Sequence, residues 1–170
     1  MKNIVLNHTK WSISRLQIII GVAALALGVV LYLYDRPSSQ VYFVPDLFSQ
    51  YKGERFLFGE LGYHLPTFLH AFAFCLITAG LLSNGTRQAL IICLFWLFVD
   101  GSLEVAQHPN IANKIISYIP DWFKHIPILD NTENYLLQGR YDPADLAAIV
   151  IGITTAYALI FFLHINVEEK

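Results

Sequence analysis

Charged side chains are scarce in this chain of 170 residues, of which Asp, Glu, Lys and Arg make up only 14%. Soluble domains carry about 25% of these residues. Hydrophobic residues make up 55% of the chain, and the mean hydropathy is +0.49. The shortage of charge therefore excludes an ordinary soluble domain and indicates an integral membrane protein.

Basic clusters and cysteine motifs are also missing. The net charge is -2 and Lys and Arg form no block, so nothing in the sequence indicates a nucleic-acid partner. The two cysteines, Cys75 and Cys93, each lie within an apolar run. We therefore expect buried packing residues rather than a disulfide or a metal pair. We predict neither a metal site nor a cofactor.

Long apolar runs, in contrast, are abundant. The first of them follows a few basic residues but has no small-residue cleavage site, so we expect an uncleaved span rather than a signal peptide. Four runs are long enough to cross a bilayer of about 30 Å, at residues 16–34, 65–82, 88–107 and 146–167. We predict an all-α, polytopic integral membrane protein whose residues 1–170 form one domain, a small bundle of four transmembrane helices.

Two helix starts carry local signals. Pro66 is expected in the first turn of the second span, where a missing N–H costs nothing. Asp142 is the expected N-cap of the fourth span, with Pro143 at its first helical position.

The distribution of Lys and Arg favours an orientation in which both termini are cytoplasmic, because the basic residues are densest in the short segments on that side. This arrangement predicts a multi-pass protein of the cell membrane. The connecting segments at about 35–64 and 108–141 then lie outside. Both are rich in aromatic residues, which favour the membrane interface.

Three polar side chains interrupt the third span. Asp100, Glu104 and Gln107 fall on one face of a helix, after a run of residues without charge. A carboxylate at mid-membrane depth costs roughly 2.5–3.5 kcal/mol on insertion scales. Such residues usually face a partner, a cavity or water, so this triplet is the first candidate for function.

The order of the spans brings further polar residues to the same depth. Because successive spans run in opposite directions, His70 of the second span and the residues at the start of the fourth lie level with the triplet. The predicted cluster is His70, Asp100, Glu104, Gln107, Arg140, Asp142 and Asp145.

Structural roles compete with a functional role for several of these residues. Asp142 and Asp145 suit a helix N-terminus, and Arg140 suits an ion pair or contact with lipid head groups. His70 suits a hydrogen-bonded histidine inside the bundle. Glu104 has no such local explanation, although an ion pair with Arg140 would join the third and fourth spans.

These motifs resemble the VanZ-like membrane protein family, named for a teicoplanin-resistance protein. The resemblance is strongest over residues 65–155. It is carried by the His- and Phe-rich second span around His70, by Glu104-x-x-Gln107, and by Arg140-x-Asp142-x-x-Asp145-Leu146, which is followed by small residues through Gly152. The resemblance implies a small helical bundle and, for the namesake, reduced glycopeptide action. Asp100 has no assigned place in this pattern.

Three functions are consistent with the sequence. The first is recognition or modulation of a membrane lipid or a lipid-linked cell-wall precursor from the outer face, with an effect on glycopeptide susceptibility; Arg140 would face phosphate. The second is an intramembrane enzyme that uses His70, Asp100, Glu104 and Asp145, although no catalytic motif is present. The third is an accessory subunit of a membrane complex, whose protein partner would contact the small residues Gly21, Ala24 and Gly28.

Overall fold

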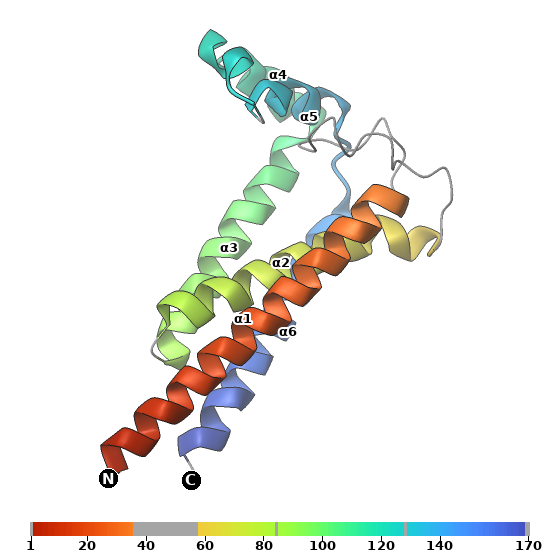
Figure 1. Ribbon diagram of the computed structural model, residues 1–170. Coiled ribbons are helices and arrows are strands. Elements are labelled where there is room, and N and C mark those ends of the chain that lie inside the picture. The colour runs from red at the N-terminus through yellow and green to blue at the C-terminus, as the bar shows by residue number, and fades with distance from the viewer. Residues whose placement is uncertain (1, 36–57, 84, 128, 169–170) are drawn as a thin grey trace.

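The computed structural model describes residues 2–35, 58–83, 85–127 and 129–168, and every regular element in these ranges is helical (Figure 1). The four longest helices are α1 (Lys2–Asp35), α2 (Glu60–Leu82), α3 (Thr86–Ala106) and α6 (Pro143–Glu168). They contain the candidate membrane spans Ser14–Asp35, Leu61–Leu82, Thr86–Ala106 and Pro143–Ile165. The predicted all-α membrane protein with four spans is thereby confirmed.

Pro66 lies inside α2 rather than in its first turn, so that part of the prediction is wrong. The helix begins at Glu60, directly after Gly59, whose φ of 55° ends the preceding segment in a conformation that favours glycine. The chain from Leu61 onward is apolar enough to extend the helix past the expected start. A proline in a helix interior removes one backbone hydrogen bond, so α2 gives up the bond between residues 66 and 62.

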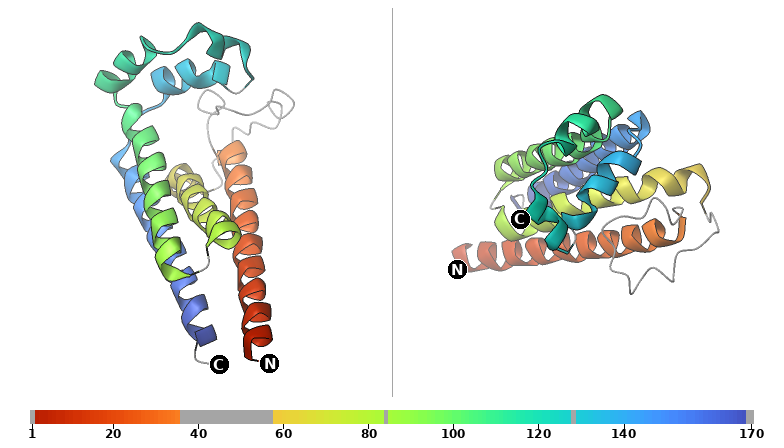
Figure 2. Two further views of the ribbon diagram at one scale, coloured as in Figure 1. Left: turned by 90° about the vertical axis from the view of Figure 1, so that its left-hand side faces the viewer. Right: turned by 90° about the horizontal axis from the view of Figure 1, so that it is seen from above.

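α2 packs against each of the other three long helices, α1, α3 and α6. Figure 2 shows α1 and α3 on either side of it. The core that joins α2, α3 and α6 consists of small and medium side chains, and both free cysteines are buried in it. The expectation that Cys75 and Cys93 are packing residues is therefore confirmed.

Glycines allow close approach between the helices. A Cβ atom at Gly152 of α6 would lie 2.6 Å from the carbonyl oxygen of Phe68 in α2. At Gly21 of α1, a Cβ atom would lie 2.7 Å from Ile77 Cγ1, and at Gly28 it would lie 3.2 Å from Leu69 Cβ. Gly21 and Gly28 are thus packed against α2 of the same chain. A protein partner at this stripe stays a prediction.

The ends of the bundle differ in character. The first turns of α1 and the last turns of α6 lie at one end, and the segment between α3 and α6 covers part of the other (Figure 2). That segment contains α4 (Pro109–Ile116), the 3-10 helices η3 (Asp121–His125) and η4 (Leu129–Asn131), and α5 (Thr132–Gln138). It exposes large apolar side chains, as expected for an interfacial segment: Ile111, Ile115, Tyr118, Trp122 and Ile126. Most of the other predicted aromatic segment, residues 36–57, lies outside the described residues.

Candidate ligand-binding cavity

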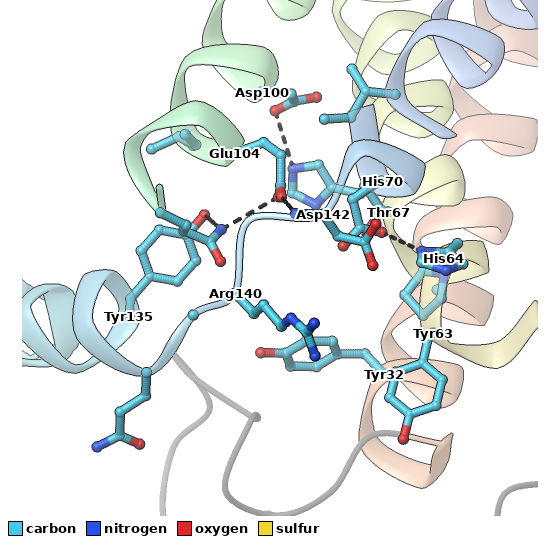
Figure 3. A pocket seen from close by; sticks show the side chains of 18 of the residues that line it. Tyr32, Tyr63, His64, Thr67, His70, Asp100, Glu104, Tyr135, Arg140 and Asp142 are labelled. Atoms are coloured by element: carbon cyan, nitrogen blue, oxygen red, sulfur yellow. Dashed lines mark hydrogen bonds and ion pairs between the residues drawn. The ribbon is translucent and has the colours of Figure 1, made fainter. Parts of the chain in front are cut away.

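A cavity of about 1290 Å³ opens among α1, α2, α3, α5 and α6 (Figure 3). All seven side chains of the predicted cluster line it: His70, Asp100, Glu104, Gln107, Arg140, Asp142 and Asp145. Residues far apart in the sequence meet here because α3 ends, and α6 begins, at the level of the first turns of α2. The structure therefore brings together every residue that the span order placed at this depth.

Glu104 joins the end of α3 to the start of α6. Its Oε1 accepts a hydrogen bond of 2.8 Å from the backbone N–H of Asp142, and Gln107 Nε2 lies 3.5 Å from its Oε2. Gln107 Nε2 also donates to Tyr135 Oη at 2.6 Å, which ties α5 to the same point. Glu104 is only 7% exposed, so these donors replace the water that a carboxylate otherwise requires.

An ion pair between Glu104 and Arg140, one of the structural roles that the sequence allows, is absent from the described residues. Figure 3 shows the Arg140 side chain directed toward Tyr32 and away from Glu104. The physical reason is that the first N–H groups of a helix have no partner within the helix. The N–H of Asp142 at the start of α6 is therefore an available donor, and it occupies the carboxylate oxygen that faces α6.

The start of α6 is held by two further carboxylates. Asp142 Oδ1 accepts a hydrogen bond of 2.9 Å from the N–H of Ala144, which confirms Asp142 as the N-cap ahead of Pro143. Asp145 Oδ1 lies 2.9 Å from Nδ1 of His64 on α2, a hydrogen bond between two spans. His64 was missing from the predicted cluster. Residue type and spacing gave no signal for it, because a histidine near the end of a span is equally suited to the membrane interface.

Asp100 and His70 form a looser pair deeper in the bundle. Nε2 of His70 lies 3.7 Å from Oδ1 of Asp100, which is too long for a hydrogen bond. Asp100 is 7% exposed, and its Oδ2 is buried with no hydrogen-bond partner among the described residues. The imidazole of His70 is half exposed and packs against the ring of Phe74. Asp100 is thus a buried carboxylate that the rest of the described chain leaves without a donor.

Arg140 and several tyrosines complete the polar part of the cavity. Arg140 is exposed, and within the described ranges no carboxylate forms an ion pair with it. The lining tyrosines are Tyr32 of α1, Tyr63 of α2 and Tyr135 of α5. Sequence reasoning missed them because residue type alone does not show the direction in which a tyrosine hydroxyl points.

The four residues expected for an enzyme take part in three separate interactions. His70 lies beside Asp100, whereas Asp145 lies beside His64 and Glu104 holds α6. Within the residues that the structure describes, no three side chains of His, Cys, Asp or Glu are arranged to hold a metal ion. Comparison with protein-family models, curated proteins and solved structures finds no match to this chain.

Proposed function

We propose that this protein binds the polar head group of a membrane lipid, or of a lipid-linked envelope precursor, in the cavity between its spans. The observation that carries the proposal is that one cavity has a polar part and an apolar part. The polar part holds the cluster around Arg140, and the apolar part is lined by Leu25 and Val29 of α1 and by Leu103 of α3.

The apolar lining favours an amphiphile over a water-soluble ligand. Val29 and Leu103 are each 49% exposed and lie on helices that are long and apolar enough to span a membrane. A ligand whose head group occupies the polar part can therefore extend its hydrocarbon chain along these residues into the surrounding lipid. Such a path keeps the hydrocarbon chain in an apolar environment while the head group occupies the polar part of the cavity.

Arg140 is the contact proposed for phosphate. Its guanidinium is a planar donor that matches two phosphate oxygens at once. The acidic residues nearby do not neutralise it within the described chain, because Glu104 and Asp145 take other donors. Tyr32 and Tyr63 line the same part of the cavity and present hydroxyl groups that donate or accept hydrogen bonds.

The location of the protein, its orientation and its role in the cell envelope also form part of this proposal. We place the protein in the cell membrane with both termini in the cytoplasm, because of the density of basic residues in the short segments on that side. The cavity then faces the outer leaflet. The resemblance to the VanZ-like family supports a role in the cell envelope, including an effect on glycopeptide susceptibility.

Phospholipid bound to protein purified in mild detergent provides the direct test. Arg140→Ala is expected to lower the phosphate that copurifies and the affinity for added fluorescent phospholipid by about tenfold, the loss of roughly one charged hydrogen-bonded contact. Arg87→Ala is the matched control, because Arg87 is an exposed arginine of α3 outside the cavity lining. Equal binding by both variants and the unchanged protein would contradict the proposal.

A cellular measurement tests the envelope role separately. Cells that express the unchanged protein are expected to differ from cells that express Arg140→Ala in the glycopeptide concentration that stops growth. The Arg87→Ala variant should behave as the unchanged protein does. Identical sensitivity in all strains, at equal protein levels, would remove the envelope role and leave lipid binding intact.

A further inference from the structure

We infer that the ligand of this cavity carries a primary amine, whose ammonium group binds between Asp100 and His70. The inference rests on the proposed function, in that it takes the cavity to be a lipid site, and it specifies the class of lipid. The ligand is an amphiphile that carries both a phosphate for Arg140 and an ammonium for Asp100.

The first observation is the isolation of the Asp100 carboxylate. It accepts no hydrogen bond from any residue that the structure describes, although the residue is only 7% exposed. A buried carboxylate without donors is costly, and the cost falls when a cation and its hydrogen bonds take the place of water. Since Asp100 lines the cavity, a ligand in the cavity is well placed to supply that cation.

The second observation is the balance of charge in the lining. Four carboxylates line the cavity, on Asp100, Glu104, Asp142 and Asp145, against the one guanidinium of Arg140 and the imidazoles of His64 and His70. With neutral imidazoles, the described lining is therefore negative. A lipid that brings only a negative phosphate meets this excess unfavourably, whereas a lipid that also brings a positive amine matches it.

The carboxylates differ in the hydrogen-bond donors that they contact. Glu104 accepts from the N–H of Asp142, Asp142 accepts from the N–H of Ala144, and Asp145 bonds to His64. These hydrogen bonds hold the start of α6 in place. Asp100 has no comparable structural duty in the described chain, so it is the carboxylate on which an ammonium group is best placed to act.

The spacing of the pair suits an ammonium donor. Asp100 Oδ1 and His70 Nε2 are 3.7 Å apart, so one nitrogen atom can lie at about 2.9 Å from both. An ammonium group has several donors and can serve the carboxylate and a neutral imidazole together. A quaternary amine has the same charge but no N–H, and it is too bulky to approach both atoms. The predicted preference is therefore for primary over quaternary amines.

The test compares lipids that share a phosphate. The protein is placed in nanodiscs of phosphatidylcholine that contain an equal minor fraction of phosphatidylethanolamine or phosphatidylglycerol, and the lipid that copurifies is identified by native mass spectrometry. The unchanged protein is expected to enrich phosphatidylethanolamine about tenfold over phosphatidylcholine, and Asp100→Asn should abolish the enrichment. Asp130→Asn, at an exposed aspartate of η4, is the matched control and should retain it.

The outcomes separate the two claims. Binding that depends on Arg140 but shows no preference for phosphatidylethanolamine in the unchanged protein would overturn the amine inference and leave the lipid site standing. The loss of any dependence on Arg140 would overturn the proposed function itself. Because the comparison of lipids in the unchanged protein needs no variant, poor folding of Asp100→Asn does not prevent the test.

Competition distinguishes a lipid amine from a free one. Soluble ethanolamine phosphate, which lacks a hydrocarbon chain, is added at increasing concentration to protein loaded with fluorescent phosphatidylethanolamine. Displacement only at concentrations far above those of a short-chain phosphatidylethanolamine is the expected result for a lipid site. Equal potency of the two would assign the cavity to a soluble aminophosphate and contradict the lipid class proposed here.

Discussion

Glu104 accepts a hydrogen bond from the backbone N–H of Asp142 at 2.8 Å, across 38 residues of sequence, and so joins the last turn of α3 to the N-cap of α6. A charged acceptor at a helix N-terminus also interacts favourably with the helix dipole. The polar face of the third span is thus partly a structural joint between two spans.

The joint predicts a graded loss of stability. Glu104→Gln keeps an oxygen acceptor and is expected to lower the free energy of unfolding by about 1 kcal/mol, whereas Glu104→Ala leaves the N–H of Asp142 without its acceptor and should cost about 1–3 kcal/mol. Unfolding in mixed micelles by denaturing detergent measures both values. Glu133→Ala, at an exposed glutamate of α5, is the control and should be close to neutral. Equal effects at positions 104 and 133 would contradict the joint.

The close approach of α2 and α6 predicts opposite effects for two glycine substitutions. Gly152→Ala places a Cβ atom 2.6 Å from the carbonyl oxygen of Phe68, whereas a Cβ atom at Gly101 of α3 meets nothing within 4 Å. Gly152→Ala is therefore expected to destabilise the bundle by about 1–3 kcal/mol through overpacking. Gly101→Ala should be neutral or stabilising by up to about 1 kcal/mol, because alanine favours a helix. The same unfolding assay measures both.

If Gly152→Ala proves as harmless as Gly101→Ala, the two helices do not approach as closely as the structure shows. The comparison is informative because each variant adds the same methyl group to the interior of a membrane-spanning helix. Helix propensity therefore contributes equally to both, and the difference reports the contact with Phe68.

The sequence could predict the spans and the depth of the polar residues, because both follow from the lengths of apolar runs and the alternating direction of the helices. His70, Asp100 and Arg140 reach one cavity for that reason. It could not predict the partners within the cavity. Whether Glu104 takes a guanidinium or a backbone N–H depends on the path of the few residues before Pro143, which the pattern of residue types does not specify.

The sequence also could not predict how the helices are rotated about their axes or at which residue α2 begins. The direction of the Tyr32 and Tyr63 side chains depends on the rotation of α1 and α2 about their axes. A hydrophobic run alone does not determine that rotation. The extra turns of α2 before Pro66 were unexpected because proline usually marks a helix start. Here Gly59, rather than the proline, precedes the first helical residue.

Gln17 of α1 predicts a stabilising substitution. The residue is 1% exposed, and its Nε2 has no hydrogen-bond partner among the described residues. Gln17→Leu has similar volume and removes the unsatisfied amide, so it is expected to raise the free energy of unfolding by about 1–2 kcal/mol. Asn113→Leu, at an exposed position of α4, is the control for a polar-to-apolar change and should give no such gain. A loss of stability in Gln17→Leu would show that the amide has an essential partner.

Tyr135 predicts how firmly α5 is held over the cavity. Its hydroxyl accepts a hydrogen bond of 2.6 Å from Gln107, whose other contact is Glu104 at 3.5 Å. Tyr135→Phe removes this acceptor and is expected to weaken the attachment of α5 by about 1 kcal/mol. The backbone amides of residues 132–138 should then exchange hydrogen roughly fivefold faster, while those of α2 remain unchanged.

The control for this change is Tyr118→Phe, because Tyr118 is 85% exposed and its loss of a hydroxyl should leave exchange in α5 unaltered. Gly139→Ala provides an independent route to the same result, since a Cβ atom there would collide with the side chain of Gln107 and the carbonyl of Tyr135. Tyr135→Phe and Gly139→Ala are both expected to accelerate exchange in α5 and to speed the release of bound lipid, because α5 forms part of the cavity wall. Faster exchange without faster release would show that α5 lines the cavity but does not retain its ligand.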